Sequence, residues 1–317
     1  MKIVFMGTPE YARAALEALI GAGHEILAVV TQPDRSRGRS RILVPPPVKI
    51  CAEKYGIDVL QPRRIRKPEA VAALRQYPAD VYIVAAFGQI LSQEILDIPP
   101  FGCLNIHASL LPRYRGASPI QHAILDGEEK TGVTIMQMDA GIDTGDMLYK
   151  KETAISPRDD YETLHDRLAV LGGEAIREAL VLLEQGKLVP MKQEEELSCY
   201  APMISKEMGA IDFTQDAGSV GRRIRAMTPW PSAYTDYQGK QLKIWKAEPA
   251  YAVNVFGRIP GEILQTDRDC VTVAAGEGAL RIYELQLEGR KRMTAHDFLL
   301  GVRMQPGEVL GASGKER

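Results

Sequence analysis

The sequence predicts an α/β protein with a Rossmann-like, mainly parallel sheet domain followed by a smaller OB-like β-barrel domain. Three observations lead to this fold class. In the first half of the chain, short apolar runs alternate with segments of helical spacing, which is the pattern of βαβ units. A long helical stretch follows. The last third carries short β-rich runs separated by turn residues, as in a small barrel.

The first domain opens with a buried strand at 3–6 and a turn at 7–10. Apolar residues at 12, 15, 16, 19 and 20 then form one face of a helix. Further strands are predicted at 26–30, 57–60, 81–85 and 102–107. The first turn lacks the GxGxxG pattern, and Pro9 stands where a dinucleotide-binding loop needs a small flexible residue. This argues against a nicotinamide-dependent oxidoreductase.

A long helix is predicted to close the first domain. Ser156 and Pro157 are typical of an N-cap and a first helical residue. Apolar residues then recur at helical spacing, at 161, 164, 168, 171, 175, 179 and 182, until Gly186. The polar sequence beyond it, with the acidic run 194–196, predicts a solvated linker. The predicted organisation is a domain at 1–189, a linker at 190–204 and a second domain at 205–317.

The second domain is predicted to begin with a helix at 217–227. The β-rich runs that follow lie at 234–237, 242–246, 261–265, 270–274 and 279–287. Short runs that recur with turn residues between them favour a small barrel of the OB-like kind.

Composition restricts the class of protein. The chain has 317 residues, which is long enough for two domains with full cores. Its composition, 45% hydrophobic and 25% charged, is typical of a globular protein. A net charge of −2 gives no global sign of a nucleic-acid partner, so any RNA binding must come from local patches. The four cysteines have no CxxC spacing, which predicts reduced thiols without disulfides or zinc. With no signal peptide or membrane span in the sequence, we expect a cytoplasmic protein that does not contact membranes.

Two polar segments predict a site for chemistry. Asn105 and His107 are two residues apart on a strand-like run, so their side chains share a face. Pro112 and Gly116 end that run and place both side chains near its carboxyl end, where open α/β sheets bind ligands. Asp143 lies in a glycine-flanked loop and is a plausible partner for His107. The alternative is that Asn105 and His107 are satisfied structural residues and that Asp143 forms an Asx-turn.

The same residues are compatible with other kinds of site. Ser109, His107 and Asp143 could form a hydrolase triad, but Ser109 lacks the GxSxG elbow and shares a short loop with His107. His107 and His122 lack the helical spacing of metal ligands and have no accompanying carboxylate cluster, so no metal is expected. A non-catalytic RNA-binding protein is disfavoured by the combination of Asn105, His107 and Asp143.

An arginine-rich loop follows the second strand. It carries Arg35, Arg37, Arg39 and Arg41, and it is longer than most connections between a strand and a helix. Arginines at this density favour phosphate groups, although a solvated charge run is the alternative.

The segments around Asn105, His107 and Asp143 resemble the signature of the folate-dependent formyltransferases. The resemblance implies that these three residues are catalytic, without a covalent enzyme intermediate, and that the co-substrate is 10-formyltetrahydrofolate with no metal. It also implies two folate-binding segments, which consist of Phe87, Gly88, Gln89 and Ile90 and of Ser109, Leu110, Leu111 and Pro112.

The resemblance extends beyond the site. Residues 1–190 resemble the catalytic domain of the tRNA-acting members of this family, and 228–231 (TPWP) resembles part of their C-terminal domain. The implied activity is transfer of the formyl group to the α-amine of methionyl initiator tRNA, for translation initiation. The arginine loop would contact the acceptor stem, with Arg39 the most important, and 205–317 would bind tRNA.

The sequence departs from the family's pattern at Tyr114, where relatives often carry Trp, and at Ser118, where they often carry Ala. Neither is a catalytic position. Formyltransferases acting on glycinamide ribonucleotide or nucleotide sugars, and formyltetrahydrofolate hydrolases, share the same three residues and remain the alternatives. We expect a monomer.

Overall fold

The fold comes from a computed structural model that describes residues 1–36 and 42–311. The chain forms two compact units. The first contains Met1–Pro119, Lys130–Ala154 and His165–Ala201, and the second contains Ile120–Glu129, Ile155–Leu164 and Pro202–Arg317. The predicted domain limits at 189 and 205 stay a prediction. The structure adds that two short segments from the middle of the chain, Ile120–Glu129 and Ile155–Leu164, cluster with the C-terminal part.

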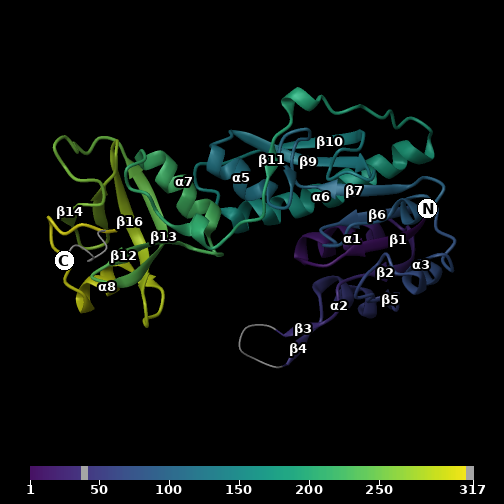
Figure 1. The fold of residues 1–317 in the computed structure, drawn as a ribbon, viewed down its shortest axis with the longest axis horizontal. Helices are drawn as coiled ribbons and strands as arrows, with labels where there is room; N and C mark the ends of the chain where they lie inside the picture. Colours follow the sequence, from purple (N-terminus) through teal and green to yellow (C-terminus); the bar gives the residue numbers. More distant parts are fainter. Residues whose placement is uncertain (37–41, 312–317) are drawn as a thin grey trace. The chain divides into compact units, whose positions relative to one another are not determined.

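Seven strands form the sheet of the first unit, in the order β10-β9-β7-β6-β1-β2-β5 (Figure 1). Their bounds are β1 Lys2–Gly7, β2 Glu25–Val30, β5 Asp58–Leu60, β6 Val81–Ala85, β7 Cys103–His107, β9 Lys130–Gln137 and β10 Met147–Ala154. Neighbours from β7 to β5 run parallel, whereas β9 is antiparallel to both β7 and β10. The predicted Rossmann-like, mainly parallel sheet is confirmed.

The other elements of the first unit surround this sheet or extend from it. The helices are α1 Glu10–Gly21, α2 Pro47–Lys54, α3 Pro68–Leu74, α4 Gln93–Leu96 and most of α6 Tyr161–Glu184, and a single 3-10 turn lies at Glu195–Leu197. The short strands β3 Arg35–Ser36 and β4 Leu43–Val44 pair as an antiparallel hairpin, and β8 Arg115–Gly116 pairs with β11 Tyr200–Ala201 in parallel.

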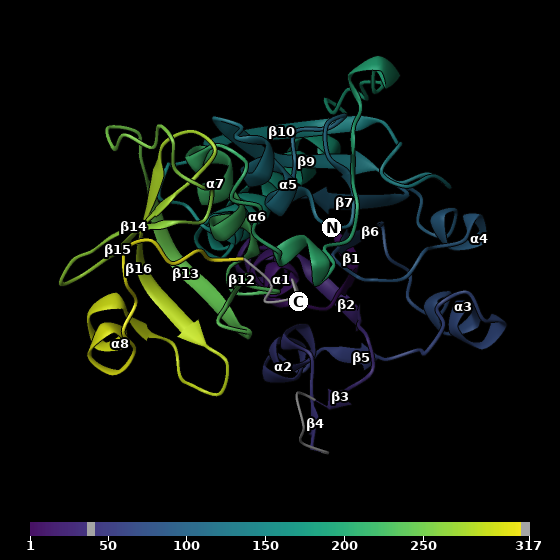
Figure 2. The same ribbon diagram turned by 60° about the vertical axis from the view of Figure 1, so that its left-hand side comes forward.

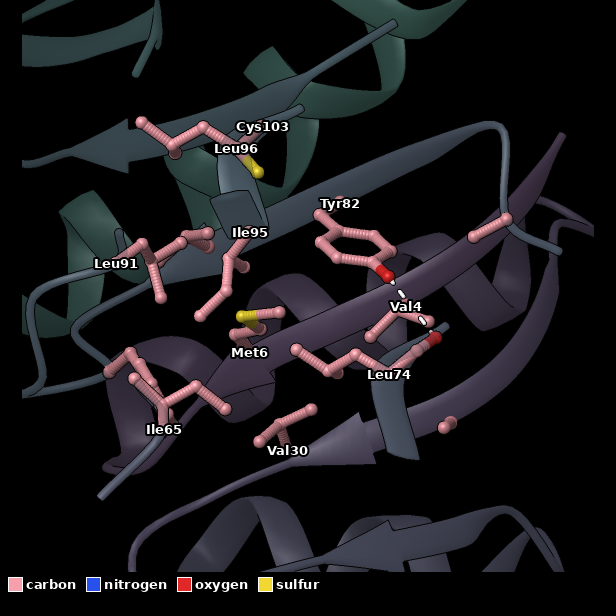
Figure 3. Packing of buried hydrophobic residues seen from close by; sticks show 14 of the residues in the cluster. Val4, Met6, Val30, Ile65, Leu74, Tyr82, Leu91, Ile95, Leu96 and Cys103 are labelled. Carbon is pink, nitrogen blue, oxygen red and sulfur yellow. Dashed lines mark hydrogen bonds between the residues drawn. The ribbon is translucent and has the colours of Figure 1, made fainter. Parts of the chain in front are cut away.

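The central strands are apolar along their whole length because both faces of the sheet are covered. Val4, Met6 and Tyr82 share one face and pack in the cluster of Figure 3, where the Tyr82 hydroxyl donates to the Leu74 carbonyl at 3.3 Å. Burial raises the pKa of that hydroxyl. Phe5 lies between Val4 and Met6, so its side chain points to the opposite face, and it is fully buried too.

The strand order reverses between β1 and β6. From β1 the chain proceeds outward through β2 and β5, and then returns to the other side of β1 to form β6 and β7. Open α/β sheets bind ligands in the crevice at the carboxyl ends of the strands where the order reverses. Here the ends of β1 and β6 are followed by Thr8 and Ala86, and the parallel β7 ends at the same edge with His107.

The long helix starts later than predicted. Ser156 and Pro157 precede it in a turn, and α6 begins at Tyr161. Asp160 is the residue that caps it, because its carboxylate accepts from the Thr163 amide at 2.9 Å while the Thr163 hydroxyl accepts from the Asp160 amide at 3.0 Å. The predicted N-cap at Ser156 is therefore wrong, and the cap lies four residues later, at Asp160.

Two segments of the first unit differ from the sequence-based expectation. β10 is an edge strand with no apolar alternation in its sequence, and it was not predicted. Residues 191–201, predicted to be part of a linker, are fastened to the first unit by a bridge between Met147 and Met191 and by β11. We call residues 191–201 the strap.

The second unit contains an antiparallel sheet in the order β12-β13-β16-β15-β14, with β17 paired to β16 (Figure 2). The strands are β12 Ala233–Tyr237, β13 Lys240–Ala250, β14 Ile263–Thr266, β15 Val271–Ala274, β16 Ala279–Leu287 and β17 Met293–Thr294. The helices are nearly all of α5 Pro119–Asp126, then α7 Ala217–Met227 and α8 Ala295–Gly301, with a 3-10 turn at Glu207–Gly209. The predicted OB-like β domain is confirmed, and α7 has the predicted bounds.

Two further observations concern the described residues as a whole. The four cysteines are free thiols, and Cys51, Cys103 and Cys270 are buried. Within 1–36 and 42–311, no helix has the length and apolar character needed to cross a membrane.

Candidate active site

The structure brings Asn105, His107 and Asp143 together. Asn105 and His107 lie at the carboxyl end of β7, where they pair with Met136 and Thr134 of β9. The Asp143 carboxylate faces both of them: Oδ1 accepts from Asn105 Nδ2 at 3.4 Å, and Oδ2 lies 3.6 Å from His107 Nδ1. The His107 side chain is 6% exposed and the Asp143 side chain 17% exposed, so the cluster is largely shielded yet open on the side of Asp143.

Asp143 is not the Asx-turn residue of its loop. That part is played by Asp139, whose carboxylate accepts from the Gly141 amide at 2.9 Å and from the Thr144 hydroxyl at 2.7 Å. Asp143 itself has φ of 53°, in the left-handed region, and its Oδ2 accepts from the Gly116 amide at 2.8 Å. The carboxylate is therefore directed away from its own loop and toward β7.

The backbone carbonyl of Tyr114 determines the tautomer of the His107 imidazole. His107 Nε2 lies 2.9 Å from the Tyr114 carbonyl oxygen. A carbonyl oxygen only accepts, so Nε2 carries the proton and Nδ1 is the nitrogen that faces Asp143 and the open side. Tyr114 has φ of 61°, and its amide donates to Cys199 Sγ at 3.2 Å. The carbonyl that orients His107 is thus held in place by the strap.

The segment 109–112 is built into the sheet. The Ser109 hydroxyl is fully buried and donates to the Arg113 carbonyl at 2.6 Å, which leaves the hydrolase triad without its nucleophile. The Thr134 hydroxyl donates to the Ser109 carbonyl and accepts from the Leu111 amide. Lys150 Nζ donates to the Leu111 carbonyl at 2.5 Å, and burial lowers the pKa of that amine. Leu110 and Pro112 are partly exposed beside this network.

The segment 87–90 lies at the point where the strand order reverses. Phe87 is buried in the core, and its carbonyl accepts from the Thr8 hydroxyl at 3.2 Å and from Gln32 Nε2 at 3.1 Å. Gln89 ties the loop to its neighbour by accepting from the Ile65 amide and donating to the Pro62 carbonyl. A cavity of about 550 Å³ adjoins this segment and is lined by Arg64, Ile65, Arg66, Lys67, Gly88, Gln89 and Ile90.

The arginine loop begins in the hairpin of β3 and β4. Arg35 is exposed and donates to Gln32 Oε1 at 3.2 Å, whereas Arg37, Arg39 and Arg41 lie outside the described residues. The base of the hairpin is clamped at Asp34, whose carboxylate accepts from Lys49 Nζ at 2.9 Å and from Gln61 Nε2 at 2.7 Å. Both hydrogen bonds lower the pKa of Asp34, and the bond from Gln61 has the larger effect.

Some functional contacts were not found from the sequence. The Tyr114 carbonyl is a backbone group, so no residue type reveals it. Gln193 donates from Nε2 to the carbonyls of Asp143 and Gly145, both at 2.8 Å, yet it stands in a polar run that reads as solvated. Among the described residues, no group of three or more His, Cys, Asp or Glu side chains is arranged to hold a metal ion.

Comparison with known proteins identifies the family. The sequence pattern of formyl transferase matches residues 1–180, and that of the formyl transferase C-terminal domain matches residues 203–303. The chain belongs to the formyl transferase family. This formyl transferase is 52% identical to the methionyl-tRNA formyltransferase of Geobacter metallireducens over 311 residues, which cover 98% of this chain and 99% of the relative. The methionyl-tRNA formyltransferase of Caldanaerobacter subterraneus is 49% identical over 311 residues, covering 98% of this chain and all 100% of the relative.

Solved structures share the fold of this formyl transferase. HypX from Aquifex aeolicus, in complex with tetrahydrofolic acid, matches with a TM-score of 0.66 and 21% identity over 96% of this chain and 49% of that chain. Methionyl-tRNA formyltransferase from Clostridium thermocellum matches with a TM-score of 0.53 and 19% identity over 78% of this chain and 93% of that chain. At these identities the similarity concerns the fold alone.

Proposed function

We propose that this formyl transferase moves the formyl group of 10-formyltetrahydrofolate onto the α-amine of the methionine esterified to initiator tRNA. The observation that carries the reaction is the Asp143 carboxylate, which faces the Asn105 amide and His107 Nδ1 at 3.4 and 3.6 Å. The acceptor follows from the relatives: proteins 52% identical over nearly the whole chain are named for this activity.

The chemistry needs donors for an oxyanion and an acceptor for a proton. The amine nitrogen attacks the formyl carbon, the carbonyl electrons move to oxygen, and a tetrahedral oxyanion forms. When it collapses, the bond from that carbon to N10 of the folate breaks, and N10 takes the proton that the amine loses. Asn105 Nδ2 and protonated His107 Nδ1 are the donors that stabilise the oxyanion. Asp143 supports the imidazolium and passes the amine proton, directly or through one water.

The folate donor would use both segments at the carboxyl edge of the sheet. Phe87, Gly88, Gln89 and Ile90 would bind the pterin through apolar contacts and backbone groups, with Ser109, Leu110, Leu111 and Pro112 on the other side. Three cations, Arg64, Arg66 and Lys67, line the adjoining cavity of about 550 Å³ and suit the carboxylates of a folate.

The tRNA acceptor would bind through local positive charge, because the chain as a whole has a net charge of −2. The arginine loop supplies four cations within seven residues: Arg35, Arg37, Arg39 and Arg41. The loop follows β2, which is the neighbour of β1, the strand at which the order reverses. Residues 205–317 would contribute a second tRNA surface.

The test offers the purified protein 10-formyltetrahydrofolate with three acceptors in parallel: methionyl initiator tRNA, free methionine and glycinamide ribonucleotide. We expect formylation of the charged tRNA alone, and uncharged initiator tRNA is the control that lacks the amine. Formylation of glycinamide ribonucleotide instead would overturn the acceptor. Release of formate at the same rate without any acceptor would make the protein a hydrolase.

A further inference from the structure

The strap, residues 191–201, touches both halves of the candidate active site within the first unit. At one end, Gln193 contacts the loop of Asp143. At the other end, the Cys199 carbonyl accepts from the Arg115 amide at 2.9 Å, next to the Tyr114 carbonyl that orients His107. A segment that reads as a linker therefore reaches the surroundings of both titratable residues of the site.

Gln193 uses its whole side-chain amide in these contacts. Nε2 donates one bond to the Asp143 carbonyl and one to the Gly145 carbonyl, each of 2.8 Å, and Oε1 accepts from Arg115 Nε at 3.0 Å. Arg115 is in turn buried and holds the Glu195 carboxylate through Nη1 at 2.9 and 3.0 Å. Gln193 is thus fixed from behind and presents its two N–H groups to the loop.

The Asp143 loop needs such a contact. Asp143 occupies the left-handed region at φ of 53°, which is an unfavourable conformation for a residue with a side chain. The bonds from Gln193 grip the backbone on both sides of Thr144, so they hold this conformation from outside the loop. The Gly116 amide then meets Oδ2 of the same residue and directs the carboxylate toward His107.

We propose that Gln193 is a positioning residue for catalysis, acting through its two donated hydrogen bonds to hold the Asp143 carboxylate opposite His107 and Asn105. The inference rests on the proposed catalytic role of Asp143. It predicts that Gln193 affects the chemical step more than substrate binding, because the strap residue contacts the backbone of the site and not the segments assigned to the folate.

Two substitutions test this. Gln193→Leu removes all three bonds, and Gln193→Glu keeps the acceptor for Arg115 but removes the donors to the loop. Both should lower kcat by roughly 10- to 100-fold and leave the KM values for folate and tRNA within about threefold, since a displacement of about 1 Å costs on the order of 10²-fold. Gln93→Leu is the matched control, because Gln93 is an exposed α4 residue whose side-chain amide donates to Asp97, the C-cap of the same helix. It should leave kcat unchanged.

A double-variant cycle measures whether Gln193 works through Asp143. In single-turnover reactions, Gln193→Leu should add less than about a twofold loss once Asp143→Asn is present, since residues acting as a unit are not additive. Full activity of Gln193→Glu, a fully multiplicative loss in the cycle, or an equal loss in Gln93→Leu would overturn the inference. The outcome that instead removes the proposed role of Asp143 is full activity of Asp143→Asn alone. If Gln193→Leu folds poorly, Gln193→Glu answers the same question.

Discussion

At the scale of single residues, each side chain of the site uses one polar atom to bond within the protein and directs another toward the other groups of the site. His107 gives Nε2 to a backbone carbonyl and keeps Nδ1 for the open side. Asp143 accepts from a backbone amide with Oδ2 and from the Asn105 amide with Oδ1. Each group is oriented by a bond that does not involve substrate, so little reorganisation is needed when the oxyanion forms.

Asn105→Ala tests this arrangement. If Asn105 is the proposed donor to the oxyanion, loss of its amide should lower kcat by about 10²–10³. The dissociation constant for the folate donor should change far less, because the donor acts mainly on charge that develops during the reaction. Initial-rate formylation assays measure kcat, and a folate titration measures the dissociation constant of the donor. An equal loss in both would show that Asn105 binds the ground state and has no special role in the transition state.

At the scale of elements, the site depends on how closely β9 and its following loop approach each other. A Cβ atom on Gly145 would lie 1.7 Å from the Gln137 carbonyl oxygen, so this position accepts only glycine. Because Gly145 lies so close to Gln137, the next residue of the loop can rejoin the sheet, and the Gln137 amide donates to the Asp146 carbonyl at 2.8 Å. Asp143 stands at the far side of this turn, and its position follows from that closure.

Gly145→Ala should therefore displace the loop and destabilise the protein by about 1–3 kcal/mol, as overpacking does. We expect a lower melting temperature together with a reduced kcat. Gly21→Ala is the control, because Gly21 is the last residue of α1 and a Cβ there meets nothing within 4 Å. Thermal unfolding and formylation rates of both variants decide the matter. A Gly145→Ala protein as stable and active as the parent would mean that the loop has room to move.

At the scale of the whole molecule, the proposed recognition of a large anionic acceptor depends on a few concentrated patches of positive charge. The chain has 39 basic and 41 acidic residues, so its overall charge does not attract RNA. The arginine loop places four arginines within seven residues, and it belongs to a hairpin whose short strands are exposed.

Replacing Arg35, Arg37, Arg39 and Arg41 together by Ala should lower kcat/KM for charged tRNA and reduce its dependence on salt. Each lost phosphate contact removes about 0.9 from the slope of log K against log salt. The melting temperature should move by only a few degrees, roughly, since exposed charges add little stability. Rates at two salt concentrations measure the effect, with the slow hydrolysis of the donor alone as the internal control. Wild-type tRNA kinetics at both concentrations would exclude the loop as an RNA contact.

The sequence was sufficient for the features that depend on local pattern. The apolar run at 81–85 and the amphipathic stretch at 217–227 became β6 and α7 with those bounds. β10 was missed because an edge strand with a polar face has no apolar run to reveal it. The predicted start of α6 was wrong because Ser156 and Pro157 lie in a turn, and reciprocal bonds between Asp160 and Thr163 cap the helix instead.

In the site, the pairing of Asn105 and His107 on one face could be read from their spacing, and Asp143 from its glycine-flanked loop. The strap could not be found in this way. Its contacts join residues 50 and 48 positions apart in sequence through backbone carbonyls, which every residue possesses. Only the fold shows which carbonyls a glutamine such as Gln193 can reach.

The clamp at the base of the arginine hairpin makes that hairpin an exchangeable module. Asp34 is fixed by Lys49 and Gln61, so the ends of the insertion are held together by the sheet domain itself, whatever the chain between them contains. With the ends fixed, doubling the length of the intervening loop costs only about 0.6 kcal/mol. Replacing the segment between Ser36 and Leu43 should therefore change the acceptor that the loop is proposed to recognise, while the residues proposed to carry out formyl transfer stay as they are.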